Sequence, residues 1–152
     1  MKISSLIQRR VTSCTIHDNL ERAAQLMWDH DIGCLPVIDE QGHVAGMITD
    51  RDVCMAAYTQ GLPLRAILVA SVMAKHVFSC TERDEVDAVE RTMRERQVRR
   101  MPVIDDQGHP IGIISLNDFV RAAGAGKLPA PEVTATIAAV STPRMVIASA
   151  PA

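Results

Sequence analysis

Two short segments place a hydroxyl group three residues before a carboxylate, each at the end of an apolar run. The first segment contains Thr49 and Asp52, and the second contains Ser115 and Asp118. This spacing is typical of a capping box, in which side chains satisfy the free amide groups of a helix's first turn. A helix N-terminus can also bind an anion, because its amide dipoles favour negative charge. Taken alone, the two segments favour capping over ligand binding.

Other reactive side chains are not arranged for catalysis. The cysteines of the chain are Cys14, Cys34, Cys54 and Cys80. They form no C-x-x-C pair and have no histidines at metal-ligand spacing, so we interpret them as small buried thiols. No nucleophile has an adjacent base, and Asp52 and Asp118 belong to separate, equivalent motifs rather than to an acid–base pair. We therefore predict a protein that is not an enzyme and has no metal or other cofactor.

The composition is typical of a globular protein and excludes several classes of partner. The chain has 152 residues, of which 47% are apolar and 22% are charged. A net charge of −2 and an aromatic content of 3% leave neither a basic surface nor a base-stacking platform. The sequence has no apolar run of membrane-spanning length and no signal peptide. We expect a cytoplasmic protein that binds neither nucleic acid nor membrane.

An internal repeat determines the organisation of the chain. When the sequence is shifted by 66 residues, residues 3–57 align with residues 69–123 without a gap. Of the 55 aligned positions, 19 are identical, and "CLPVIDEQGHVAGMITDRDVCMAA" lies over "RMPVIDDQGHPIGIISLNDFVRAA". The chain therefore contains two copies of one supersecondary unit.

Each copy is predicted to form the element order β-α-β-β-α after a short helical turn. The turn is residues 3–7 in the first copy and residues 69–73 in the second. A β-branched strand then leads into an amphipathic helix, whose expected N-caps are Asp18 and Asp84. Two apolar strands joined by a polar turn form a hairpin, and a second helix closes the copy.

The predicted fold class is α+β, with the two repeats packed sheet to sheet about a pseudo-twofold axis. A single three-stranded unit is too small to bury both faces of its sheet, which explains why the unit is doubled. Two related clefts are expected where the copies face each other. The expected parts are a first repeat, a linker, a second repeat and a C-terminal extension, at residues 3–59, 60–68, 69–123 and 124–152. The extension is interpreted either as a flexible tail or as a short helix over about 131–140 that docks on a partner subunit.

The repeat resembles a tandem pair of CBS domains, the arrangement often called a Bateman module. The resemblance covers residues 3–123 and rests on two doubled motifs. One is the hairpin "PVID-x-x-G-H", and the other is the segment "G-h-h-T/S-x-x-D", where h is an apolar residue. The resemblance implies a free-standing regulatory module that binds adenosine compounds in the clefts between its copies and associates into a dimer.

The resemblance also assigns roles to the two motifs met first. In the family, the final acid binds the ribose hydroxyls and the hydroxyl residue contacts phosphate. By position, Asp52 and Asp118 are the ribose acids, and Thr49 and Ser115 are the phosphate contacts. A carboxylate can accept hydrogen bonds from a vicinal diol while it also caps a helix, so the two roles are compatible.

The two copies differ just before the second strand of each unit. The second copy has Arg99 and Arg100, whereas the first has Gly33 and Cys34 at the aligned positions. In nucleotide-binding relatives, basic residues here reach the phosphates, so we predict a phosphate clamp formed by the two arginines. The alternative is a solvated basic face that continues the charged helix upstream. The clamp makes the second copy the better candidate for a phosphate-bearing ligand.

An adenine pocket is implied by family position rather than by residue chemistry. Its candidate walls are Thr12, Ser13, Ile32, Phe78, Ser79 and Val98. Most of these residues suit a strand or core without any ligand. Gly46 and Gly112, which begin the two motifs, are expected to let a ligand approach the backbone closely.

We therefore expect a homodimeric sensor of AMP, ADP or ATP that acts on an unknown regulated protein. Two alternatives stay open. One is a ligand-independent dimeric scaffold whose motifs serve only as caps, and the other is a module that binds S-adenosylmethionine. The two arginines argue against the latter, because S-adenosylmethionine has no phosphate.

Overall fold

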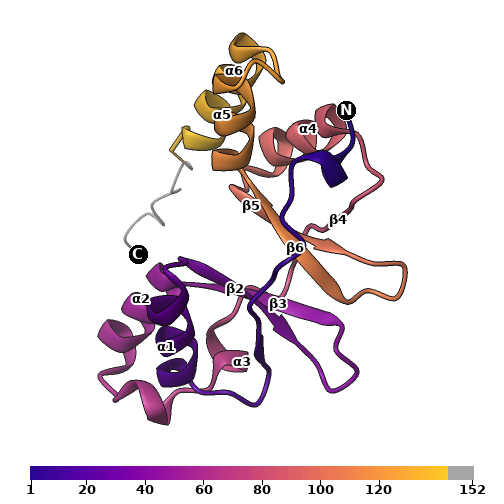
Figure 1. The fold of residues 1–152 in the computed structure, drawn as a ribbon. Helices are drawn as coiled ribbons and strands as arrows, with labels where there is room; N and C mark the ends of the chain where they lie inside the picture. The colour runs from indigo at the N-terminus through magenta and orange to yellow at the C-terminus, as the bar shows by residue number, and fades with distance from the viewer. Residues whose placement is uncertain (144–152) are drawn as a thin grey trace, which may run out of the picture.

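The computed structural model describes residues 1–143, which form two similar halves (Figure 1). The first half of the chain contains η1 (Ile3–Ser5), β1 (Cys14–Thr15), α1 (Leu20–His30), β2 (Cys34–Ile38), β3 (Val44–Thr49) and α2 (Asp50–Gln60). The second contains η2 (Leu64–Ala66), α3 (Val69–Val72), β4 (Cys80–Thr81), α4 (Val86–Arg96), β5 (Arg100–Ile104), β6 (Pro110–Ser115), α5 (Leu116–Gly124) and α6 (Ala130–Ser141). The α+β class and the repeated order are confirmed, while residues 144–152 of the expected extension lie outside the described residues.

The two sheets have the same topology. Strand β2 pairs in parallel with β1 and antiparallel with β3, and β5 pairs in the same way with β4 and β6. Even the irregularity in register recurs, between Val37 and Ile38 in one hairpin and between Val103 and Ile104 in the other. The strand pairs of the two sheets are thus identical when the residue numbers are shifted by 66, as the sequence repeat predicts.

The two halves meet at the turns of their hairpins. Asp39 and Asp105 shape these turns, because each carboxylate accepts two backbone N–H bonds from residues that follow it. The imidazole rings of His43 and His109 stack across the interface with their centroids 5.4 Å apart. A backbone hydrogen bond of 3.2 Å also joins the two turns. Equivalent side chains therefore face each other across the pseudo-twofold axis.

The short turn that precedes each repeat packs in the opposite half. Ile3 of η1 is fully buried in the core of the second half, and its amide donates to the Asp84 carbonyl at 2.9 Å. Val69 of α3 is fully buried in the core of the first half, and its amide donates to the Asp18 carbonyl at 2.9 Å. Each turn therefore completes the core of the other copy, a packing that the sequence repeat did not predict.

Buried apolar side chains of residues 1–143 form two clusters, one in each half. Leu20, Leu35 and Ile48 lie in the first cluster, and Met101 and Phe119 lie in the second. Each cluster fills the space between a sheet and the helices that cover it, so each half is stabilised mainly by its own core. Within the described residues, no helix has the length and apolar character of a membrane span.

The N-caps predicted for the first helix of each copy were wrong. Asp18 and Asp84 lie just before the helices, where each carboxylate accepts the amide N–H of Thr15 or Thr81 at 2.7 and 2.8 Å. The short aspartate side chain closes the turn after the strand and is therefore not available for capping. The N-cap of α1 is Asn19, the next residue along the chain.

The C-terminal extension contains α6, which packs on its own chain over α4 and α5 (Figure 1). Val133 and Val140 are almost fully buried in the second core. The Arg94 guanidinium of α4 donates to the Thr136 hydroxyl of α6 at 3.0 Å. The helix is therefore part of the folded second half. Neither of the two interpretations, a flexible tail or a helix that docks on a partner subunit, predicted this packing.

Candidate functional site

A cleft of about 560 Å³ lies between the two halves. The sequence-predicted residues that line it are Thr49, Phe78, Val98, Arg99 and Arg100. Asp50, Arg51, His76 and Gln97 add further polar groups to its lining. The structure thus brings one motif of the first half together with the strand entry of the second half. We call this space the central cleft.

The local structure explains why these groups converge. Thr49 is both the last residue of β3 and the N-cap of α2, so the first turn of α2 opens onto the central cleft. Arg100 begins β5, where it pairs in register with Ser115 at the end of β6. The aligned pair in the first sheet is Cys34 with Thr49. In each half, the last residue of the third strand is also the N-cap of the helix that follows. Thr49 and Ser115 therefore lie at equivalent edges of the two sheets.

The central cleft carries an excess of positive charge. Arg51, Arg99 and Arg100 line it, and within residues 1–143 none of the three forms an ion pair. Asp50 is the carboxylate that lines the cleft. A methyl group on Gly33 would lie 3.1 Å from Asp50 Oδ2 and 3.7 Å from Arg100 Nη2, so the arginine reaches the first half. Unpaired guanidinium groups beside a helix N-terminus suit an anion such as phosphate.

One wall of the central cleft is aromatic. The His76 and Phe78 rings meet edge to face with their centroids 4.9 Å apart. The guanidinium of the exposed Arg96, which does not line the cleft, lies 5.2 Å from the Phe78 ring centre. Val98 adds an aliphatic surface to the same cleft. A flat aromatic and aliphatic wall beside cationic groups is the combination that a purine nucleotide requires.

A second cavity of about 340 Å³ adjoins the central cleft. Arg99 and Arg100 line both spaces, and Ser115 lies in the second one. Ile137 and Ser141 of α6 close this cavity on its outer side. The two arginines therefore lie beside the motifs of both halves and not only beside that of the second copy, which they made the better candidate for a phosphate-bearing ligand.

The two motif acids form the expected capping boxes but differ in their remaining contacts. Asp52 Oδ2 accepts the Thr49 amide at 2.9 Å, and the Thr49 hydroxyl accepts the Asp52 amide at 3.1 Å. Asp118 Oδ2 accepts both the amide and the hydroxyl of Ser115, at 2.7 and 2.6 Å. The Arg121 guanidinium pairs with Asp118 Oδ1. Asp52 forms no ion pair within residues 1–143, so its second oxygen is the more available acceptor.

The positions of the two acids also differ. Asp118 lines a small cavity of about 150 Å³ near Leu6 and Lys127, whereas Asp52 lies beside the residues that line the central cleft without lining it. Both carboxylates are only partly exposed. Contact with a ribose would therefore require a side-chain rotation or a small movement of the first helical turn.

The remaining adenine candidates do not share the central cleft. Ile32 lines a groove between α1 and α2 in the first half. Thr12, Ser13 and Ser79 line neither that groove nor the central cleft. Sequence reasoning also missed His76 and Arg51. His76 aligns with Arg10, and basic residues at both equivalent positions were the signal that could have identified it. Nothing in the sequence distinguished Arg51 from an ordinary helix residue.

The motif glycines accommodate the chain itself. A methyl group on Gly46 would lie 2.6 Å from Met73 Sδ and 2.9 Å from the Ala74 carbonyl oxygen. Met47 and Ala74 exchange two backbone hydrogen bonds at this crossing. Gly112 meets the Gln8 carbonyl oxygen in the same way, at 3.3 Å from its methyl position. These glycines allow the segment that enters each repeat to cross the sheet of the other repeat. The space was expected to admit a ligand, but the chain itself occupies it.

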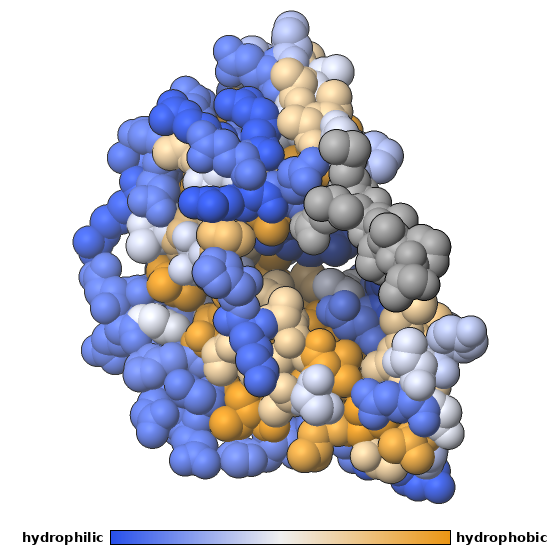
Figure 2. Space-filling view, turned by 180° about the vertical axis from the view of Figure 1, so that it is seen from behind, coloured by the Kyte–Doolittle hydropathy of each residue, from blue (hydrophilic) through white to orange (hydrophobic). Residues whose placement is uncertain are grey.

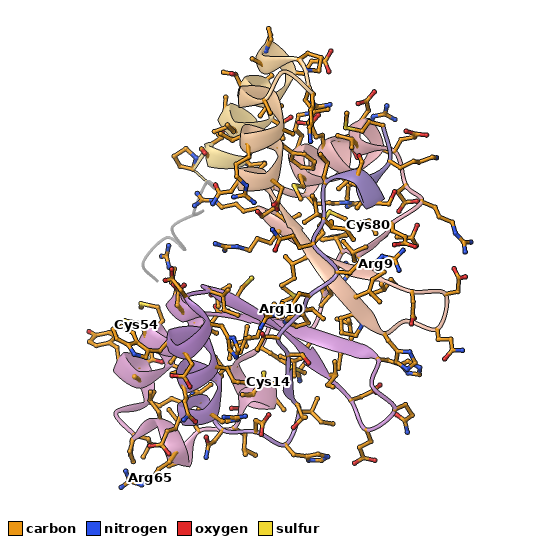
Figure 3. All side chains as sticks on the ribbon, viewed as in Figure 1. Arg9, Arg10, Cys14, Cys54, Arg65 and Cys80 are labelled. Atoms are coloured by element: carbon orange, nitrogen blue, oxygen red, sulfur yellow. The ribbon has the colours of Figure 1, made fainter. Side chains whose placement is uncertain are left out.

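Three of the cysteines, Cys14, Cys34 and Cys80, are buried. Figure 3 labels Cys14 in the first half and Cys80 in the second. Burial, with the charge of Asp18, raises the pKa of Cys14 to about 12. Burial, with the charge of Asp84, raises the pKa of Cys80 to about 12. Burial also raises the pKa of Cys34, although Arg100 opposes the rise. These three thiols are protonated at neutral pH and are poor nucleophiles.

The chain was compared with known families and proteins. The model of the CBS domain matches residues 3–58 and 69–125. The CBS domain-containing protein YhcV of Bacillus subtilis is 30% identical over 117 residues, which cover 77% of this chain and 81% of YhcV. Hypoxic response protein 1 of Mycobacterium tuberculosis is 32% identical over 111 residues, covering 73% of this chain and 77% of that protein.

Solved structures share the same fold. The structure of Hypoxic Response Protein I with two coordinated zinc ions has a TM-score of 0.71 and 29% identity, covering 80% of this chain and 98% of that one. The CBS domain pair of protein MJ0100, in complex with 5-methylthioadenosine and S-adenosyl-L-methionine, has a TM-score of 0.72 and 26% identity. It covers 84% of this chain and 98% of that one. With a matching family model over both repeats, the chain belongs to the CBS-domain family and is a tandem CBS pair.

Proposed function

We propose that this CBS pair is a regulatory module that binds AMP, ADP or ATP in the central cleft and is not itself an enzyme. The observation that carries the proposal is the set of three guanidinium groups, those of Arg51, Arg99 and Arg100, which form no ion pair within residues 1–143 and line the cleft with one carboxylate and an aromatic wall. The cleft volume of about 560 Å³ lies within the range of small-molecule sites, roughly 300–1,000 Å³.

Each part of a nucleotide has a partner in this proposal. The phosphates would contact Arg99, Arg100 and the N-terminus of α2 at Thr49, where charge-assisted hydrogen bonds are strongest. Phe78 and Val98 would pack against the adenine ring. Asp52 would accept hydrogen bonds from the ribose of this ligand. Ser115 and Asp118 would serve a second ligand in the equivalent position of the other half.

Signalling would require a ligand that binds two arrangements of the module with different affinity. A phosphate held by Arg100 of the second half and Thr49 of the first would bridge the halves and favour one arrangement. We further propose a homodimer, because the first half exposes large apolar side chains such as Trp28, Tyr58 and Leu62. Figure 2 shows apolar residues gathered over the lower half of the molecule, which is the first repeat in Figure 1.

A calorimetric titration with AMP, ADP, ATP and S-adenosylmethionine tests the proposal. We expect the phosphate-bearing ligands to bind and Arg100→Ala to weaken ATP binding by roughly 10- to 150-fold, the loss of about 1.5–3 kcal/mol for hydrogen bonds to a charged group. Arg91→Ala is the matched control, because Arg91 is an exposed arginine of α4 outside the cleft lining. Unchanged ATP binding in Arg100→Ala would remove the phosphate clamp. Absence of binding by every adenosine compound at millimolar concentration would leave the ligand-independent scaffold.

S-adenosylmethionine is the second candidate ligand. It is favoured by the likeness to the CBS pair of MJ0100, whose structure holds this compound and 5-methylthioadenosine. Neither compound contains a phosphate, and only S-adenosylmethionine has an anionic group, a single carboxylate, so three guanidinium groups suit a polyphosphate better. Tighter binding of S-adenosylmethionine than of ATP, unaffected by Arg100→Ala, would select this candidate.

A further inference from the structure

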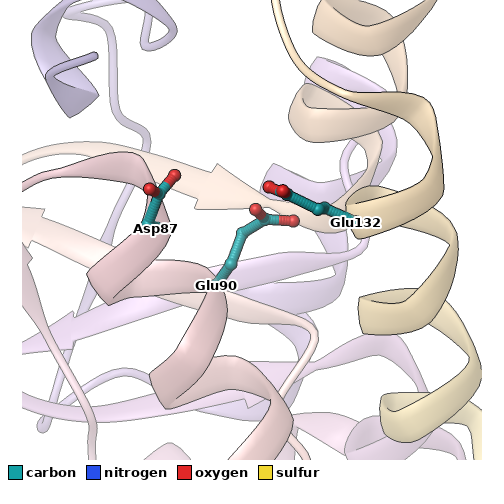
Figure 4. Close-up of side chains that lie close together, drawn as sticks. All are labelled: Asp87, Glu90 and Glu132. Carbon is teal, nitrogen blue, oxygen red and sulfur yellow. The ribbon is translucent and has the colours of Figure 1, made fainter.

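Three carboxylates from two helices converge at the outer side of the second half (Figure 4). Asp87 and Glu90 lie three residues apart on one face of α4, and Glu132 lies in the first turn of α6. One oxygen from each side chain can be chosen so that the three atoms lie within 4.8 Å of one another. Figure 4 shows the Glu90 carboxylate pointing into the space between the other two.

Glu90 is unusual because it is both buried and incompletely satisfied. Its side chain is only 3% exposed, and Oε1 has no hydrogen-bond partner among residues 1–143. An ionised carboxylate in this position is expensive unless a positive charge balances it. The aligned residue of α1 is Ala24, so the fold does not need a carboxylate here.

Nearby cations do not balance these charges. Within the described residues, none of Asp87, Glu90 and Glu132 forms an ion pair. The guanidinium of Arg94, in the same helix as Glu90, donates to the Thr136 hydroxyl. Burial raises the pKa of Glu90, and the Thr136 hydroxyl and the Arg94 charge only oppose this rise. Among residues 1–143, these three neighbouring carboxylates, one with an unsatisfied buried oxygen, therefore have no ion-pair partner.

We propose that Asp87, Glu90 and Glu132 bind a divalent cation of the oxygen-preferring class, with calcium as the ion that fits the spacing. Calcium takes oxygen ligands at roughly 2.3–2.6 Å, so oxygens on opposite sides of the ion are up to about 5.2 Å apart. Each pair of the three oxygens lies within 4.8 Å, which is below this limit. Magnesium, at about 2.0–2.1 Å, limits the oxygens to about 4.2 Å apart and demands near-octahedral geometry, so calcium accepts the wider range of spacings. Asp87 and Glu132 are exposed, which leaves room for water ligands.

The bound cation would tie α6 to α4. Glu132 belongs to the same helix as Ile137 and Ser141, which close the cavity beside Ser115. Cation binding would therefore fix the helix that forms the outer wall of that cavity. The cation site itself does not depend on the nucleotide proposal, because its three ligands line neither that cavity nor the central cleft.

Calorimetric titration of the chelator-treated protein with calcium chloride, in the absence of nucleotide, tests the site. We expect one binding event with Kd on the order of 10⁻⁴–10⁻³ M, the range of calcium sites with few protein carboxylates, and a calcium-dependent rise in Tm. Glu90→Gln should weaken binding at least about tenfold and abolish the rise in Tm. Glu132→Gln, an exposed change that spares the core, should do the same.

The matched control is Glu95→Gln, because Glu95 is an exposed residue of α4 outside the cluster and should leave calcium binding unchanged. The site is refuted if the wild-type protein shows neither heat nor a shift in Tm with calcium at about 10 mM. It is also refuted if both Glu90→Gln and Glu132→Gln bind calcium as tightly as the wild type. Tighter binding of magnesium than of calcium would overturn the choice of ion.

Discussion

The groove between α1 and α2 is open in the first half, whereas α6 covers the equivalent surface between α4 and α5 in the second. The open groove has a volume of about 480 Å³ and is lined by Ala24, Trp28 and Asp31, among others. The residues aligned with these three are Glu90, Arg94 and Gln97. Arg94 and Gln97 both donate hydrogen bonds to α6. These positions therefore bind α6 in the second half, whereas the aligned positions line an open groove in the first half.

This difference shows that the two repeats kept their backbone plan while their surfaces diverged in polarity. Trp28 is 87% exposed, and the aligned Arg94 lies half-buried under α6. A polar side chain suits the covered face because Thr136 of α6 gives it a hydrogen-bond partner. The exposed tryptophan instead marks a surface suited to an apolar partner.

The strand entries show the opposite distribution of charge. Gly33 and Cys34 of the first half leave space that Arg100 of the second half reaches into. The second copy thus contributes Arg99 and Arg100, and the small residues of the first copy leave the space that Arg100 enters. A site formed in this way cannot be assigned to either repeat alone.

The largest expected effect concerns the turns exchanged between the halves. Ile3→Ala removes a fully buried side chain from the second core and should cost about 2–5 kcal/mol in the free energy of unfolding. Chemical denaturation measures this loss. Hydrogen exchange should then quicken in β5 and β6 more than in β2 and β3.

Val69→Ala is the matched change, because Val69 occupies the aligned position and is fully buried in the first core. It should quicken exchange mainly in β2 and β3. If Ile3→Ala instead loosened the first half, the exchange of turns between the halves would be wrong. Equal loosening of both halves by each variant would show a single cooperative unit.

The next effect compares the two motif acids and rests on the proposed nucleotide site. Asp52→Ala and Asp118→Ala should each weaken ATP binding by about 1.5–3 kcal/mol at the site that the acid serves. We expect the loss at the central cleft to come from Asp52, because Arg121 already engages Asp118. Titration calorimetry on both variants measures the two losses. Unchanged binding in both would mean that the acids only cap their helices.

The sequence repeat was sufficient to predict the topology but not the packing of the turns. Alignment places Ile3 over Val69, and this equivalence holds whether each turn packs on its own copy or on the other. Only the position of the chain in space distinguishes the two arrangements. Gly46 and Gly112 were the sequence signal for this arrangement, because each lies where the segment that enters a repeat crosses the sheet of the other repeat. The signal was ambiguous, because a glycine at these positions also suits a ligand site.

The candidate site was predictable to the extent that it depends on strand ends. Thr49, Arg99 and Arg100 lie at element boundaries that the repeat fixes, and the structure brings them together. Arg51 and His76 join them through the contact between the halves, which no spacing along the chain encodes. Side-chain directions across an interface depend on how the two units pack, so they require the structure.

A smaller effect tests the covered and open helix faces against each other. Arg94→Ala removes a hydrogen bond of 3.0 Å to α6 and should cost about 0.5–1.5 kcal/mol in the free energy of unfolding. Trp28→Ala, at the aligned and exposed position, should change stability by no more than about 0.5 kcal/mol in dilute protein. Denaturation of both variants under the same conditions gives the comparison. A larger loss for Trp28→Ala would show that the groove is covered in solution.

The smallest expected effect concerns the paired hairpin turns and depends on pH. The His109 amide, aided by that of Gln107, lowers the pKa of Asp105 below its ordinary value. A carboxylate whose pKa is lowered by folding stabilises the protein above the unfolded pKa of about 3.9, and this contribution is lost as pH falls through the folded pKa. Asp105→Asn should therefore destabilise the protein at neutral pH and progressively less below about pH 4.

Asp39 provides the matched test of this pH dependence in the other turn. Desolvation alone would raise its pKa, but hydrogen bonds from the amides of His43 and Gln41 outweigh this, so its pKa is also lowered. His109 Nδ1 lies 3.3 Å from Asp105, whereas His43 Nδ1 lies 3.6 Å from Asp39. We therefore expect the stability difference from wild type to be larger at neutral pH, and to shrink more on acidification, for Asp105→Asn than for Asp39→Asn when both variants are denatured across a pH series. A difference between wild type and variant that stays constant down to about pH 3 would show that these carboxylates act only as hydrogen-bond acceptors, which asparagine replaces equally at every pH.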